Sequence, residues 1–176
     1  MSRNGITVDE VVIVVVLSAC SHLLGLRTGE LVHSLVLKIG LQAYVNLQNA
    51  LTHMYSRCGD VLAAQKLFDS GCFLDMISWN SMLSGYIKCG LVEKARELFG
   101  RMPEKDVVSW SSMILGYALF DNFTETLALF HDMLREGVRP DETTLVSVVS
   151  ACTQLAALDQ VKELFIHDLS KKWELL

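Results

Sequence analysis

One segment of the chain occurs twice, and this repetition limits the folds that the chain can adopt. Residues 10–20 read EVVIVVVLSAC, and residues 142–152 read ETTLVSVVSAC. A shorter motif returns as well, DMISW at 75–79 and DVVSW at 106–110. Self-similarity at a period of roughly 20–50 residues is typical of repeat proteins, in which each repeat is one small supersecondary unit. The chain is therefore predicted to be an array of short repeats.

The recurring motifs divide the chain into five repeats behind a short leading segment. Residues 1–9 are predicted to end a preceding unit, and the five repeats are 10–44, 45–75, 76–106, 107–141 and 142–176. A Leu-Phe dipeptide marks the same place in four of the repeats, at Leu67, Leu98, Leu129 and Leu164. The spacing predicts repeats of two lengths, 31 and 35 residues.

Each repeat shows the pattern of two short helices. In repeat 76–106 the first helix is indicated by apolar residues at three- and four-residue steps: Trp79, Met82, Leu83, Tyr86 and Ile87. Gly90 then interrupts the pattern, because glycine can adopt the left-handed conformation that closes a helix. A second helix is predicted from Val92 to Met102, before Pro103. Stacked hairpins of this kind share a core along the array, so we predict an all-α, right-handed α-solenoid.

Composition and charge exclude several other classes of protein. The chain is 51% hydrophobic and has only two prolines, so it is neither disordered nor Pro-rich. The apolar run 11–17 is far shorter than the roughly 20 residues that cross a bilayer, and no membrane association is predicted. The formal net charge of −5 disfavours nucleic-acid binding by general phosphate neutralisation.

The sequence contains no pattern typical of an enzyme or a metal site. Its five cysteines are widely spaced, and none of its five histidines belongs to a His-x-Glu or His-Glu-x-x-His motif. Neither a nucleophile with its base nor a Gly-rich phosphate loop is visible. We therefore predict no catalytic activity, no metal, no cofactor and no small-molecule substrate.

Several motifs together resemble the pentatricopeptide repeat family. They are VVSWSSMI at 107–114, ARELF at 95–99 and EGVRPD at 136–141. The mixture of 35- and 31-residue units is similar to the plant PLS subfamily, in the order long, short, short, standard, long. Tetratricopeptide repeats, which have a similar hairpin, use other signature residues.

The resemblance implies binding of single-stranded RNA, with one base read per repeat by two or three side chains. In this family the fifth residue of the first helix and the last residue of the repeat face the base. By position, the base-reading pairs are Asn49 with Asp75, Asn80 with Asp106, and Ser111 with Asp141. The family's correspondence assigns Asn-Asp to uracil and Ser-Asp to guanine, which implies a core of 5′-UUG-3′.

Other positions have implied roles as well. Ile77 and Val108 fit the apolar residue that packs against the face of a base, whereas Asn46 does not. The long repeats carry Val14 with Tyr44 and Val146 with Leu176 at the reading positions, so they are expected to act as spacers. Asp75, Asp106 and Asp141 also precede predicted helices, where their carboxylates can cap free N–H groups.

Two interpretations of function remain open at this stage. The first is the specificity module of a protein that directs RNA editing or processing in a mitochondrion or chloroplast, with editing-complex proteins as further partners. That location is implied by the resemblance, since no transit peptide is visible in the chain. The second is a protein-binding scaffold of the tetratricopeptide kind, which would need a clamp of basic residues on the first helices, and none is seen there.

Overall fold

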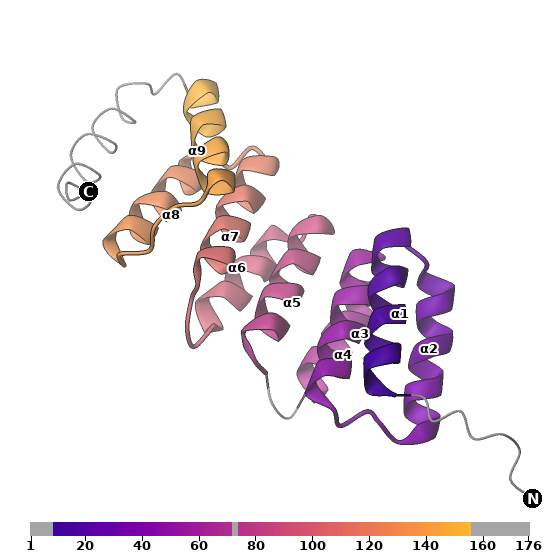
Figure 1. The fold of residues 1–176 in the computed structure, drawn as a ribbon. Coiled ribbons are helices and arrows are strands. Elements are labelled where there is room, and N and C mark those ends of the chain that lie inside the picture. The colour runs from indigo at the N-terminus through magenta and orange to yellow at the C-terminus, as the bar shows by residue number, and fades with distance from the viewer. Residues whose placement is uncertain (1–8, 72–73, 156–176) are drawn as a thin grey trace, which may run out of the picture. The chain divides into compact units, whose positions relative to one another are not determined.

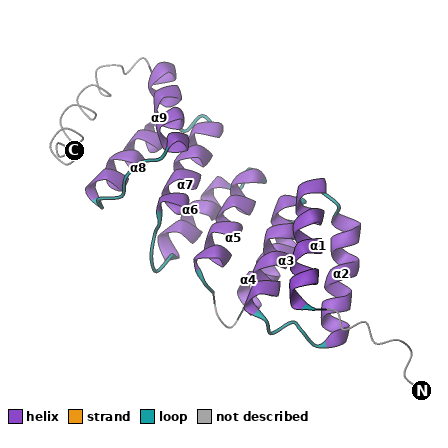
Figure 2. Ribbon diagram, in the orientation of Figure 1, coloured by secondary structure: helices purple, strands orange, loops and turns teal. Residues whose placement is uncertain are grey.

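The structure is a computed structural model that describes residues 9–71 and 74–155. The chain forms two compact bodies, an N-terminal body that ends at Cys89 and a C-terminal body that begins at Gly90. Within the described ranges every regular element is an α-helix, and loops connect successive helices (Figure 2). The predicted all-α fold is confirmed.

The N-terminal body is built around α3. Its helices are α1 (Glu10–Leu23), α2 (Leu26–Ile39), α3 (Val45–Arg57), α4 (Val61–Ser70) and α5 (Met76–Lys88). Helix α3 packs against α1 on one side and α5 on the other, while α4 lies behind it (Figure 1). The three helices that begin predicted repeats, α1, α3 and α5, therefore lie side by side and share one face of this body.

The core of this body comes from apolar side chains of α1, α3 and α5, among them Met82, which the helical periodicity indicated. Leu17 of α1, Leu47 and Met54 of α3 and Met82 of α5 are fully buried. Trp79 meets Phe68 of α4 edge to face, with ring centroids 5.0 Å apart. Since aromatic pairs prefer this geometry, Trp79 contributes to packing between helices and is not a free stacking platform.

The C-terminal body contains the other four described helices, α6 (Val92–Arg101), α7 (Val107–Leu119), α8 (Phe123–Arg135) and α9 (Glu142–Leu155). Helices α7, α8 and α9 pack against one another, and α6 packs against α7. The edge-to-face pair of the first body has a counterpart here, because Phe99 and Trp110 have ring centroids 5.0 Å apart. The two bodies thus use the same aromatic contact between corresponding positions.

Aspartates begin the helices that start predicted repeats. The side chains of Asp75, Asp106 and Asp141 accept backbone N–H groups three residues later, at 2.9, 2.8 and 2.8 Å. Each carboxylate satisfies a donor that has no partner within its helix. The predicted capping role of these residues is confirmed.

Left-handed residues end several helices. Gly90 has a φ of 73°, as the sequence predicted, and closes the loop between α5 and α6. At the corresponding place after α7, the left-handed residue is Asp121, with a φ of 59°. Aspartate tolerates this conformation better than most residues do, so the hairpin turn survives without a glycine.

Helices α1, α3, α5, α7 and α9 begin at the first residues of the five predicted repeats. The assignment of long, short and standard types stays a prediction. The predicted second helix of the last repeat, including Leu176, lies outside the described residues.

Candidate nucleic-acid interface

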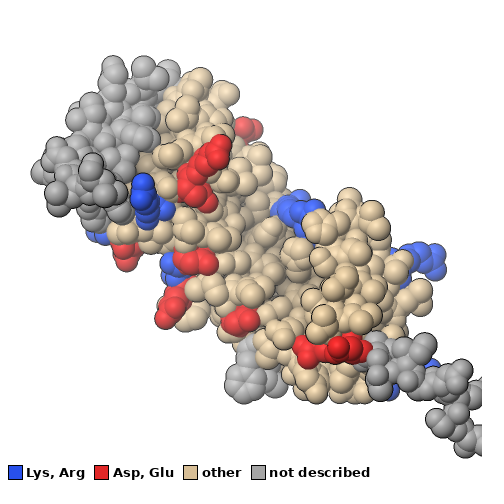
Figure 3. All heavy atoms as spheres, in the orientation of Figure 1, with Lys and Arg blue, Asp and Glu red and all other residues tan. Residues whose placement is uncertain are grey.

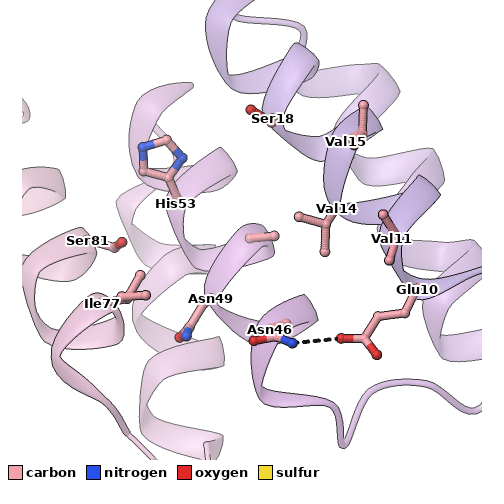
Figure 4. Close-up of a pocket in the computed structure, with 11 residues that line it drawn as sticks. Glu10, Val11, Val14, Val15, Ser18, Asn46, Asn49, His53, Ile77 and Ser81 are labelled. Carbon is pink, nitrogen blue, oxygen red and sulfur yellow. Dashed lines mark hydrogen bonds between the residues drawn. The ribbon is translucent and has the colours of Figure 1, made fainter.

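A groove runs along the shared face of α1, α3 and α5. It has a volume of about 550 Å³. Its apolar lining comes from Val11, Val14, Val15, Ala50 and Ile77. Its polar lining comes from Glu10, Ser18, Asn46, Asn49, His53 and Ser81. Figure 4 shows α1 on one side of the groove, α5 on the other side and α3 between them. The groove offers apolar surface together with a few hydrogen-bonding groups, which suits a planar, partly polar ligand.

The first predicted reading pair, Asn49 and Asp75, is in direct contact. Asn49 Nδ2 donates to Asp75 Oδ1 at 3.0 Å and to Oδ2 at 2.9 Å. The hydroxyl of Ser78 in turn donates to Asn49 Oδ1. Asn49 is only 7% exposed although it lines the groove. An amide held in this way is not an ordinary solvated side chain on a helix surface.

The carboxyl group of Asp75 stays ionised over a wider pH range than usual. Partial burial acts to raise its pKa, but hydrogen bonds from the Ser78 N–H, the Ser78 hydroxyl and the Asn49 amide outweigh burial and lower the pKa. These donors favour the charged form because an ionised carboxylate only accepts hydrogen bonds. Asp75 is therefore a negatively charged acceptor at neutral pH.

The second predicted pair is divided between the two bodies. Asn80 lies half-buried on α5 of the N-terminal body, and Asp106 caps α7 of the C-terminal body. This pair stays a prediction.

In the third predicted pair, each residue bonds to its own helix. Ser111 is buried, and its hydroxyl donates to the carbonyl of Val108 at 3.2 Å. Asp141 accepts the hydroxyl of Thr144 at 2.7 Å as well as its backbone N–H. The lone pairs of the Ser111 oxygen can still accept a hydrogen bond from a ligand.

The two residues predicted to pack against bases both have exposed side chains. Ile77 is 63% exposed and Val108 is 48% exposed. Ile77 also lines the groove beside Asn49 (Figure 4). Asn46, which the sequence marked as a poor fit for this role, instead donates to Glu10 Oε1 at 3.1 Å and links α3 to α1.

The sequence reasoning missed a group of basic side chains near the groove. His53 lines the groove, and its pKa is lowered by burial and then by the nearby charges of Lys88, Arg57 and His22. Burial and Arg57 likewise lower the pKa of Lys88. His22, Arg57 and Lys88 each stand in the last turn of their helix, α1, α3 and α5. We call His22, His53, Arg57 and Lys88 the basic rim.

A signal for the basic rim was present in the sequence. A basic residue recurs near the ends of α1, α3 and α5, where it complements the negative end of the helix dipole. Figure 3 shows basic and acidic side chains in small groups on the face that it draws. The basic rim therefore stands out against an acidic chain.

Comparison with known proteins agrees with the motifs and the fold. A model of the PPR repeat matches residues 49–70 and 77–107, and a model of the PPR repeat family matches residues 105–154. The chain belongs to the pentatricopeptide repeat family. These matches begin at Asn49 and include every predicted reading residue except Asp75.

Among its curated relatives, this pentatricopeptide repeat chain is 47% identical over 175 residues to a mitochondrial pentatricopeptide repeat-containing protein of Arabidopsis thaliana. A chloroplastic member from the same plant is 36% identical over 159 residues. The alignments include 99% and 90% of this chain but only 25% and 17% of those relatives. The chain thus spans a quarter or less of the length of these two proteins.

Solved structures of the same family show the fold. Maize PPR10 matches 93% of this chain with a TM-score of 0.71 and 22% identity, over 25% of its own length. PPR10 in complex with an 18-nucleotide psaJ RNA element matches 90% of this chain with a TM-score of 0.74. The prediction of an α-solenoid of helical repeats is confirmed.

Residues 9–71 and 74–155 contain neither a membrane-spanning helix nor a cluster of metal-binding side chains. No helix there is both long and apolar enough to cross a membrane. No group of three or more His, Cys, Asp or Glu side chains is arranged there to hold a metal ion.

Proposed function

We propose that this pentatricopeptide repeat chain binds single-stranded RNA with one base per repeat and a core of 5′-UUG-3′. The observation that supports the proposal best is the contact between Asn49 and Asp75 at the groove, beside the exposed side chain of Ile77. One side chain pair thus offers hydrogen bonds to a base edge while an apolar neighbour offers packing to a base face. PPR10, which has a similar fold, has been solved with RNA.

The chemistry of the pairs agrees with the assigned bases. The amide of Asn49 or Asn80 can donate to a carbonyl of uracil and accept from its N3–H. The oxygen of Ser111 and the carboxylate of Asp141 are acceptors, and guanine presents N–H donors at N1 and N2. With the array parallel to the RNA, the order of the repeats gives uracil, uracil and guanine. The long repeats on either side act as spacers.

The basic rim supplies the charge that such a ligand needs. A single-stranded RNA carries one phosphate per nucleotide, and positive side chains at the groove offset part of this charge. Arg57 and Lys88 lie close enough for their charges to interact, so a phosphate between them would relieve their mutual repulsion. RNA binding then relies on the charges beside the groove and does not require a net positive charge on the whole protein.

We infer that the chain acts as part of a longer repeat array. Stacking of bases on protein side chains contributes roughly 1–3 kcal/mol per base. Three reading repeats therefore provide about 3–9 kcal/mol before the cost of ordering the RNA, whereas a micromolar complex needs about 8 kcal/mol net. We propose that the whole protein is a PLS-type, non-catalytic specificity module for organellar RNA editing or processing, with editing-complex proteins as partners.

Exchange of one reading residue tests the assignment. By the family's correspondence, Asn80→Thr should change the preference at the second base from uracil to guanine, because a hydroxyl replaces the amide of the predicted pair. Binding of short labelled RNAs that differ only at this base measures the preference. The first base serves as the internal control, since its reader Asn49 is unchanged.

Two results would reject the proposal. An unchanged second-base preference in Asn80→Thr would remove the site assignment. Indifference to RNA combined with binding of acidic peptides would favour the protein-binding scaffold instead.

A further inference from the structure

The hydroxyl of Ser78 contacts both members of the first reading pair. Ser78 is the third residue of α5 and is buried. Its single O–H points between two acceptors, Asn49 Oδ1 and, at 2.9 Å, Asp75 Oδ1, which share it in a three-centre hydrogen bond. We propose that Ser78 is a positioning residue that fixes the orientation of the Asn49 amide and thereby the choice between uracil and cytosine at the first base. This inference rests on the proposed function.

Both ends of the Asn49 amide have a defined partner. Nδ2 faces the two oxygens of Asp75, and Oδ1 faces the hydroxyl of Ser78. If the amide turned around, Oδ1 would point its lone pairs at an ionised carboxylate. The Ser78 hydroxyl would then face the NH₂ group and keep only Asp75 Oδ1 as an acceptor. Asp75 and Ser78 therefore hold the amide from opposite ends.

A fixed amide can distinguish two bases that a free amide cannot. Uracil presents an N3–H donor beside its O4 acceptor, whereas cytosine presents an N3 acceptor beside its N4–H₂ donor. The two edges are thus the reverse of each other. An amide that rotates freely can pair with either edge by exchanging its oxygen and its NH₂ group, but an amide held at both ends pairs with only one.

The network leaves the amide able to bind a base. The two oxygens of one carboxylate subtend too small an angle at Nδ2 to take both of its N–H groups, so one N–H remains available. Oδ1 has two lone pairs and uses one for Ser78. A donor and an acceptor of Asn49 therefore remain for the base after both orienting bonds are made.

The corresponding hydroxyls in the C-terminal body bond differently. Ser109, the third residue of α7, donates to the backbone carbonyl of Asp106 at 2.8 Å. Thr144, the third residue of α9, donates to Asp141 Oδ1 at 2.7 Å. These bonds stay within the start of a single helix, whereas the bond from Ser78 reaches α3. Ser109→Ala is therefore a matched control that removes a hydroxyl from the same helix position.

The test compares the full chain and its variants on two RNA pentamers, 5′-AUUGA-3′ and 5′-ACUGA-3′. The unaltered chain should prefer the first pentamer. Ser78→Ala should reduce the ratio of the two affinities about five-fold, the factor that corresponds to one hydrogen bond. Ser109→Ala should keep the ratio of the unaltered chain.

A second pair of variants separates orientation from packing. Ser78→Thr and Ser78→Val have nearly the same shape and differ in the hydroxyl. Thr should keep the preference for uracil and Val should lose it, even where both variants change the unfolding midpoint equally. A merely structural role of Ser78 would move the midpoint without moving the ratio.

The network also has a readout without RNA. NMR titration should show a higher pKa of Asp75 in Ser78→Ala than in Ser109→Ala, because only the first variant loses a hydroxyl that contacts this carboxylate. If the pKa of Asp75 or the uracil preference is the same in these two variants, the inference about Ser78 is overturned. If the unaltered chain itself shows no preference among RNAs, the proposed function fails, and the inference fails with it.

Discussion

His53 is the member of the basic rim that lines the groove. It lines the groove, and its pKa is lowered by burial and by three positive neighbours, Lys88, Arg57 and His22. A folded-state pKa below the unfolded value means that the neutral form is favoured in the fold. The contribution of His53 to stability is therefore present above its unfolded pKa of about 6.5 and is lost as pH falls below that value.

RNA should reverse this shift at His53. A phosphate at the basic rim offsets the positive neighbours and favours the imidazolium, so we expect the pKa of His53 to rise on binding and the RNA affinity to increase as pH falls towards 6. NMR titration of the histidines with and without RNA measures the shift.

His33 is the control for this titration. Burial lowers its pKa too, but its Nδ1 is hydrogen-bonded to the hydroxyl of Tyr55 at 2.9 Å, and it does not line the groove. A rise of both pKa values, or of neither, would contradict a phosphate site at the basic rim.

At the scale of elements, the close approach of α5 to α3 depends on Gly85, because glycine has no side chain. A Cβ added at Gly85 would lie 2.5 Å from Ser56 Oγ and 2.8 Å from Ser56 Cβ. Real Cβ atoms do not come this close, so α3 or α5 would have to move. Because Asn49 and Ser78 stand on these same two helices, their contact depends on this packing.

Gly85→Ala should therefore destabilise the chain, although alanine normally favours a helix by about 1 kcal/mol over glycine. We expect a cost of about 1–3 kcal/mol, as for other overpacked sites, measured as a lower denaturant midpoint. The cost should shrink in a Ser56→Gly background, which removes the obstructing side chain.

Gly100→Ala provides the matched control. No atom lies within 4 Å of a Cβ built at Gly100 in α6. This variant should match or exceed the stability of the unaltered chain. Equal destabilisation by the two alanines would argue against a specific contact between α3 and α5.

The sequence predicts the residues that belong to a repeated motif, but it does not predict contacts that depend on how two helices pack. Asn49 and Asp75 were paired from the repeat motif, and the structure places them in contact. Their reading of a base stays a prediction. From the sequence, Ser78 is only a hydroxyl near the start of a helix. Its bond to Asn49 could not be predicted, because that bond depends on how α5 packs against α3. The groove position of His53 likewise depends on the rotation of α3 against α1, which one-dimensional periodicity does not define.

At the scale of the whole molecule, the chain is divided into two bodies although its repeats follow one another regularly in the sequence. The boundary between the two bodies falls at Cys89–Gly90, between the two helices of predicted repeat 76–106. The helical pattern of this repeat is as clear as that of its neighbours, so no sequence signal marks the division. Each body instead forms around its own set of packed helices.

The chain has a net charge of −5, and its affinity for RNA should nevertheless fall as the salt concentration rises. The logarithm of the binding constant should fall with the logarithm of salt concentration by about 0.7 for each phosphate neutralised on a single strand. Arg57→Gln and Lys88→Gln should each reduce this slope by about 0.7 and weaken binding equally for all RNA sequences. Fluorescence anisotropy at several salt concentrations measures both quantities.

Arg135→Gln is the control for the salt series. Arg135 lies on α8, a second helix of a hairpin, where it pairs with Asp132 at 3.4 Å. The slope should stay the same in this variant. An equal change in all three variants would mean that RNA contacts the chain without a defined path along the groove.

The bond from Ser78 to Asn49 also bears on how modules of this kind can be recombined. If residues 45–75 alone were exchanged, the new residue at position 49 would face the Ser78 hydroxyl of the original chain. An exchange that ends after Ser78 would instead transfer Asn49, Asp75 and Ser78 together. The natural joint for shuffling such arrays then lies inside the first turn of the following helix.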